Sequence, residues 1–188
     1  MKKITLLLAI QFVFLCKIQA QEVEKDFVPY YVKDGNVESF ERKGAKIEAK
    51  AIGFGYGGVN QYLTIFNSKY SDVRFKSGDT PKFIMSLEEG TDPLDLVIIT
   101  KADVVKKRKK YRRFIQKGNS MGGGNKDISQ HLIFPELKKI EGNLYEIILP
   151  ASLSPGEYAF QPIYKGKEAN NIMATSGAVR IYCFGIDG

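Results

Sequence analysis

The sequence is poor in the residues that most often bind metals or attack substrates: it has one histidine, two cysteines and no tryptophan. His131 lies far along the chain from Cys183, so a zinc site or a Cys–His nucleophile pair would lack most of its usual groups. Cys183 lies in the apolar stretch AVRIYCFGI, where we expect a small buried side chain and not a reactive thiol. These shortages predict a protein with no catalytic residues, no metal and no cofactor.

Long apolar runs are also scarce, and the single one, residues 4–15, is short. It follows Lys2 and Lys3 and precedes a cleavage site after Ala20, a pattern that predicts a signal peptide over residues 1–20. A bilayer-spanning helix needs about 20 apolar residues, so we expect no transmembrane segment in the mature chain. The chain is therefore predicted to be exported, to the periplasm or the exterior.

Cys16 raises the alternative of a lipid anchor at the end of this leader. Bulky Leu15 precedes it, where a lipoprotein would have a small residue, so the sequence disfavours anchoring through Cys16. Since Cys16 lies in the predicted leader, residues 21–188 hold one cysteine and no internal disulfide is expected. A chain of this length fits one domain that rests on packing alone.

Sustained helical periodicity is missing, and short apolar segments alternate with turn formers instead. The clearest segments carry β-branched and aromatic residues, at 62–66, 82–87, 95–100, 143–149 and 157–160, with weaker ones at 27–32, 45–52, 129–134 and 178–184. Close spacing of roughly ten strands favours a sandwich over alternating strands and helices. The sequence predicts an all-β fold: a two-layer antiparallel sandwich, immunoglobulin-like or a related Greek key, of roughly 8–10 strands over residues 21–188.

The stretch LSPGEYAF, residues 153–160, predicts its own local geometry. Pro155 and Gly156 suit the central positions of a type II turn. Tyr158 enters the following strand as in a tyrosine corner, whose hydroxyl bonds back to the backbone. Pro162 removes a ladder donor, so this strand should end, bulge or lie at an edge.

The order of several motifs resembles that of small exported β-sandwich proteins of Bacteroidetes-type bacteria. The motifs are YYVKDGNVESFE, SKYSDVRFKSGDTPKFIM, DPLDLVIITK with its basic run, LSPGEYAF and YCFGID. Together they span most of residues 27–187. They are turn and strand signatures, so the resemblance implies a fold and a compartment and carries over no activity and no site residues.

Two glycine-rich stretches need to be weighed as nucleotide sites. GFGYGG, residues 53–58, matches G-x-G-x-x-G, but the following VNQYLTIF reads as a strand where a phosphate site needs a helix. KGNSMGGGNK, residues 117–126, lacks the G-K-[ST] ending of a phosphate-binding loop and is expected to be a long mobile loop. No nucleotide cofactor is predicted.

Acidic residues offer two further alternatives. Glu88, Glu89, Asp92 and Asp95 lie close together but lack the pattern of a calcium loop, so a solvated turn is favoured. Hydrolytic carboxylates usually come from distant strands. A hydrolase whose two acids converge only in the fold therefore remains open.

The basic run is the one feature that indicates a binding function. Residues 101–117 carry nine basic side chains and one acidic one, and the core of the run is Lys106, Lys107, Arg108, Lys109, Lys110, Arg112 and Arg113. Because burying an unpaired cation is costly, we expect the run to lie at an edge or beyond the sheet. Its charges would then either discourage edge pairing or bind a polyanion.

We therefore expect a non-enzymatic binding or interaction module of the cell envelope or exterior. The sequence does not identify its partner; the candidates are an envelope polyanion and another exported protein. The alternative of a polyanion binder acting through residues 106–113 would take lipopolysaccharide, acidic glycan, anionic lipid or extracellular DNA.

Overall fold

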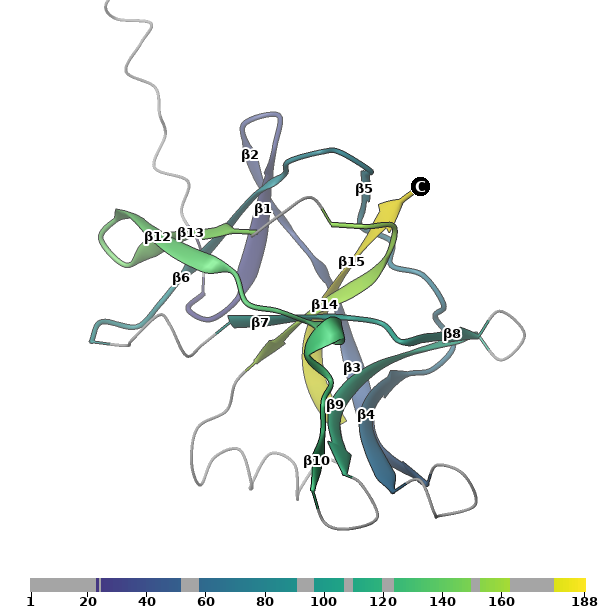
Figure 1. Ribbon diagram of the computed structural model, residues 1–188. Coiled ribbons are helices and arrows are strands. Elements are labelled where there is room, and N and C mark those ends of the chain that lie inside the picture. The colour runs from purple at the N-terminus through teal and green to yellow at the C-terminus, as the bar shows by residue number, and fades with distance from the viewer. Residues whose placement is uncertain are drawn as a thin grey trace, which may run out of the picture.

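The computed structural model describes residues 23, 25–51, 58–90, 97–106, 110–119, 124–149, 153–162 and 178–188. Of residues 104–106, 119 and 162 only the backbone is described. Within these ranges the chain is all-β, with two sheets and one turn of 3-10 helix at Ser129–His131 (Figure 1). The predicted signal peptide, residues 1–20, lies outside them.

The smaller sheet is antiparallel and has five strands. Their order is β12 (Glu136–Glu141), β13 (Leu144–Ile148), β6 (Lys82–Ser86), β1 (Pro29–Lys33) and β2 (Asn36–Ser39). Its edge strand β12 is exposed along most of its length and has a register irregularity after Lys139. Charged residues and irregularities of this kind discourage pairing with other sheets.

The larger sheet has ten strands and curls into a half-barrel. Its order is β10 (Asn125–Lys126), β9 (Tyr111–Asn119), β4 (Val59–Ile65), β3 (Glu41–Ala51), β15 (Ala178–Asp187), β14 (Gly156–Pro162), β7 (Val97–Lys101) and β11 (Leu132–Ile133). β8 (Val104–Lys106) pairs with β9, and β5 (Arg74–Lys76) runs parallel to β15. The chain passes from β7 into β8 through Ala102 and Asp103, whose amides bond to Glu157 of β14 and Arg113 of β9. The segment from β7 to β8 therefore connects strands near opposite ends of the larger sheet, β14 and β9.

Two apolar cores lie on opposite faces of β14 and β15. The inter-sheet core packs the smaller sheet on the larger one and is rich in aromatic rings, with Phe40, Phe83, Tyr158, Phe160 and Phe184 at its centre. The inner core lies within the curl and contains Ala45, Leu63, Ile65, Phe114, Ala159, Val179, Ile181 and Cys183. Alternation along β14 and β15 sends neighbouring residues to different cores, which explains why these strands read as continuous apolar runs.

The predicted all-β sandwich is confirmed, and the predicted strands match β1, β3, β4, β6, β7, β13, β14 and β15. The segment 129–134 begins as a 3-10 turn before the short β11. Strands β2, β5, β10 and β12 were not predicted, so the described residues hold more strands than the expected 8–10. The immunoglobulin-like topology stays a prediction.

The corner at residues 153–160 is confirmed in its main feature and wrong in one detail. The Tyr158 hydroxyl donates a 2.5 Å hydrogen bond to the carbonyl of Ser154, as a tyrosine corner requires. Gly156 has φ of +157° and begins β14, whereas a type II turn would give it about +80°. β14 is described as far as Pro162, which pairs with Val97 and is the last residue before the range 163–177 that lies outside the described residues.

Candidate functional site

The basic run forms a hairpin between β8 and β9. Lys106 ends β8, residues 107–109 lie outside the described ranges, and Lys110 is exposed with φ of +46°. Arg112 and Arg113 do not lie at an edge of the sheet, because β9 pairs with β8 on one side and β4 on the other. Lys106 lies in β8, which pairs with β9 and with no second strand among the described residues.

Arg112 contradicts the expectation that the run lies outside the core: its side chain is 0% exposed. Its guanidinium donates a 2.5 Å hydrogen bond to Glu41 and lies 3.6 Å from Glu157. The expectation assumed an unpaired charge, whereas here two carboxylates from β3 and β14 compensate the guanidinium. With no exposed surface, Arg112 cannot contact an external polyanion and leaves the predicted site.

The carboxylates around Arg112 extend the pairing into a charge cluster, defined as Glu41, Arg74, Arg112, Glu157 and Asp187. Arg74 contacts Glu157 and Asp187, each at 2.7 Å, and the backbone amide of Ser71 donates to Glu157 at 2.7 Å. Burial raises the pKa of Glu157, while the bonds from Arg74 and Ser71 act against that rise. The charge cluster links strands β3, β5, β9, β14 and β15 through ion pairs, and we assign it a structural role.

Arg113, next along the strand, points to the outer face of the sheet and is also engaged. It contacts Glu48 at 3.2 Å and lies 4.4 Å from the centre of the Tyr111 ring. Burial raises the pKa of Glu48, but the hydrogen bond from Thr64 and the charges of Arg113 and Lys50 outweigh it, so that pKa lies below its ordinary value. Of the predicted polyanion residues, Lys110 alone is described as an exposed side chain.

The remaining sequence candidates fall into two groups. Cys183 is 0% exposed, which confirms the expected buried side chain, and burial raises the pKa of its thiol to about 12. Glu88 and Glu89 form an exposed turn, while Asp92 and Asp95 lie outside the described ranges. No group of three or more metal-binding side chains occurs among the described residues.

The glycine-rich segments are described only in part. Residues 53–57 lie outside the described ranges, and the segment that follows them is strand β4, as predicted. β9 extends to Asn119 and pairs with β10 in the second segment, so much of the expected loop 117–126 is strand.

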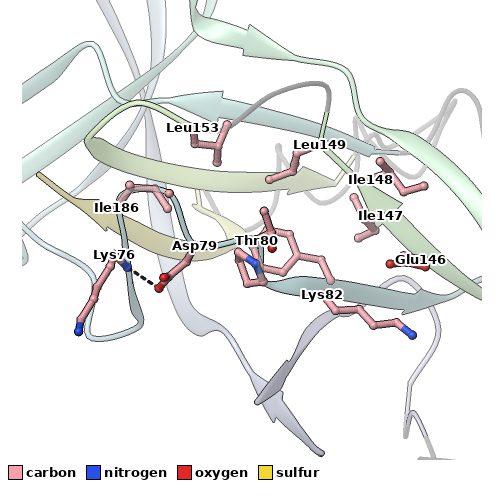
Figure 2. A pocket seen from close by; sticks show the side chains of 13 residues that line it. Lys76, Asp79, Thr80, Lys82, Glu146, Ile147, Ile148, Leu149, Leu153 and Ile186 are labelled. Atoms are coloured by element: carbon pink, nitrogen blue, oxygen red, sulfur yellow. Dashed lines mark hydrogen bonds between the residues drawn. The ribbon is translucent and has the colours of Figure 1, made fainter. Parts of the chain in front are cut away.

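A cleft of about 480 Å³ opens between the two sheets, where β6 and β13 diverge from the end of β15 (Figure 2). Its apolar lining consists of Pro81, Phe83, Ile147, Ile148, Leu149, Leu153 and Ile186. Leu149 and Leu153 project into the space opposite Thr80, and Ile186 closes one end (Figure 2). This volume and lining are typical of small-molecule sites.

Polar groups of the cleft lie at its rim. Asp79 accepts a 2.8 Å hydrogen bond from the backbone amide of Lys76 and so closes its own turn. The ammonium groups of Lys76 and Lys82 extend away from the two leucines (Figure 2). The sequence predicted the strands that carry the lining, but no local pattern indicates where two sheets will diverge, so sequence reasoning missed this site.

In comparisons with known proteins, no family model, no curated protein and no solved structure matches the chain. Among the described residues, none of the helical structure is long and apolar enough to cross a membrane.

Proposed function

We propose that the chain is an exported, non-enzymatic binding module that holds a small, largely apolar ligand in the cleft between its sheets. The observation that carries the proposal is the lining: seven apolar side chains line a space of about 480 Å³, and the ammonium groups of Lys76 and Lys82 extend away from it (Figure 2). Such a site favours burial of an apolar ligand body, while the rim leaves a polar end in water.

The chemistry near the cleft supports binding over catalysis. Asp79 is committed to its turn and Glu146 lies at the opposite end of the cleft (Figure 2). Three acids converge in the described part of the fold, Glu41, Glu157 and Asp187, and each is paired with an arginine. A hydrolase needs one acid to reach a substrate and another to act on water or the reacting carbon, and acids held in these ion pairs do not offer this.

The leader pattern of residues 1–20 supports export, to the periplasm or the exterior. The ligand would then be an envelope or extracellular compound, or an apolar group presented by another exported protein. A site of this size accommodates a compound of moderate molecular weight.

The test uses a neutral fluorescent naphthylamine, which brightens in apolar surroundings, together with backbone amide shifts of the labelled protein. We expect one dye per chain and shifts confined to residues 76–86, β13 and the end of β15. Thr80→Phe should weaken binding at least tenfold by filling the cleft. Ile140→Ser, which removes an apolar side chain that is 43% exposed on β12, should change nothing. Equal binding by the Thr80 variant, or shifts scattered over other faces, would overturn the proposal.

Polyanion capture through the hairpin is a second candidate, favoured by the exposure of Lys110 at its turn. It now depends on Lys106, Lys107, Arg108, Lys109 and Lys110, since Arg112 is buried and Arg113 is engaged. Replacing Lys107, Lys109 and Lys110 with glutamine should lower retention on heparin as salt rises. Unchanged retention would eliminate this candidate.

A further inference from the structure

A second group of cations lies on the outer face of the curled sheet, away from the hairpin. Every second residue of a strand points to the same face, so Arg42, Gly44 and Lys46 of β3 share one face. Arg180 of β15 lies directly opposite Gly44. All four residues are exposed. We call Arg42, Gly44, Lys46 and Arg180 the Gly44 patch.

The centre of the patch is bare backbone. A Cβ atom added at Gly44 would meet no other atom within 4 Å, so neither packing nor a close approach within the protein requires glycine here. Glycine weakens a strand interior, and the backbone at Gly44 is not in the left-handed region. An unneeded glycine at the middle of a cationic face leaves room for a ligand to approach the sheet.

Within the described part of the chain, the cations of the patch lack a carboxylate partner. Among the described residues, no carboxylate forms an ion pair with Arg42, Arg180 or Lys46, whereas Arg74, Arg112 and Arg113 are all paired. Lys46 lies 5.8 Å from the centre of the Phe66 ring, which leaves its ammonium able to bind an anion.

The spacing of these cations suits oxyanions carried on a chain. At about 3.4 Å per residue, Arg42 and Lys46 are separated by roughly 14 Å along β3, and Arg180 lies about 5 Å from Gly44 across the ladder. Two guanidinium groups beside an open backbone fit one sulfate or phosphate group. Lys46 would meet a second charge further along. Glu48 is the next residue of this row and pairs with Lys50 at 3.1 Å, so the row of available cations ends at Lys46.

We propose that the Gly44 patch binds sulfate or phosphate groups of a linear anionic polysaccharide. The only described aromatic ring beside it that is strongly exposed is Phe66, 42% exposed, so the face lacks the successive stacking platforms that bind nucleic-acid bases. Because the sheet is curled, only a narrow strip of it can contact a flat membrane surface. The patch also has no apolar side chain that could enter a bilayer. The cations therefore match a chain of charged sugars.

The first experiment measures binding of the full mature chain to fluorescent heparin over a range of salt concentrations. Arg42→Gln combined with Arg180→Gln should weaken binding on the order of tenfold and lower the salt slope by roughly two. The matched control, Lys138→Gln with Lys139→Gln, removes two exposed cations from the edge strand β12 and should leave both quantities nearly unchanged. Equal losses in the two variants would overturn the proposal.

The second experiment separates a built site from a diffuse positive field. Gly44→Val keeps every charge and, with open space around the added Cβ atom and the preference of valine for strands, should fold at least as well as the wild type. It should nevertheless weaken heparin binding severalfold by blocking approach to the backbone. Unchanged affinity would sink the site at Gly44.

The remaining arms distinguish the source of the anion and the other sites. Single-stranded DNA and vesicles containing anionic phospholipid should bind more weakly than heparin, and Gly44→Val should not change their affinity. If Gly44→Val weakened the binding of either one more than that of heparin, that ligand and not a polysaccharide would be assigned to the patch. The hairpin lysine variant and Thr80→Phe should leave the Gly44 effect intact, so failure of this inference is separable from failure of the cleft or the hairpin.

Discussion

At the scale of the residue, the same run of cations contains members with opposite environments. Lys110 is exposed, whereas Arg112, two positions later, is 0% exposed and paired with Glu41. The sequence does contain a hint that Arg112 faces inward, because it lies two residues before Phe114 of the inner core and so shares its face of β9. The carboxylates that compensate Arg112 come from β3 and β14, and no local pattern could have placed them there.

Replacing Arg112 should therefore be among the most damaging single changes in the protein. Arg112→Met would leave Glu41 and Glu157 buried without their shared cation, and we expect the free energy of unfolding to fall by about 3 to 5 kcal/mol. Denaturant unfolding would measure this. Lys110→Met, in the same run, should change stability by no more than about 0.5 kcal/mol.

The pH dependence of stability tests whether uncompensated charge causes the loss in Arg112→Met. Burial raises the pKa of Glu157, so in the methionine variant this carboxylate can take up a proton at pH 4, and the difference from wild type should be smaller there than at pH 7. A loss that stays constant with pH would indicate that packing, and not uncompensated charge, explains the instability.

At the scale of the element, the parallel pair β5 and β15 depends on one close approach. A Cβ atom at Gly185 would collide with the guanidinium of Arg74, which contacts Glu157 and Asp187. Glycine at this position keeps Arg74 between the two carboxylates. β5 has three residues and few apolar side chains, which is why the sequence did not predict it.

Two glycine-to-alanine substitutions in neighbouring strands should thus have opposite effects. Gly185→Ala should lower the free energy of unfolding by about 1 to 3 kcal/mol through overpacking against Arg74. Gly44→Ala, with open space around it, should be neutral or raise stability by up to about 1 kcal/mol. Thermal unfolding of both variants would test this, and a stable Gly185 variant would show that Arg74 can move aside without loss.

The elements that could be predicted are those with apolar or alternating segments between turn formers, such as β6, β13 and β15. Strand β12 escaped prediction because its sequence ELKKIE is mostly exposed and charged. The cleft and the Gly44 patch escaped for a different reason: each is assembled from strands distant in sequence. Their members become neighbours only through strand order and register, which hydrophobic pattern alone does not determine.

At the scale of the whole molecule, β14 and β15 join the two cores into one structure. Tyr158 and Phe160 face the inter-sheet core, while Ala159 between them faces the inner core. Movement of either strand therefore disturbs both cores at once. We expect a single cooperative unfolding transition and not separate melting of the smaller sheet.

Truncation in either core should reveal this coupling. Phe83→Ala in the inter-sheet core and Ile181→Ala in the inner core should each lower stability by about 2 to 5 kcal/mol. Amide hydrogen exchange should report equal losses of protection in β6 and β4 for both variants. Faster exchange confined to the sheet that carries the substitution would contradict a shared transition.

The central position of β15 also has a consequence for the rate of folding. This strand pairs with β3, from the opposite part of the chain, and with β14 on its other side. Until those distant segments meet, β3 and β14 each present an open row of amides and carbonyls to any passing strand. Slow closure of such long loops means that the nascent chain stays open to self-association for longer than a helical protein of equal size, and would benefit from a chaperone that shields its strands.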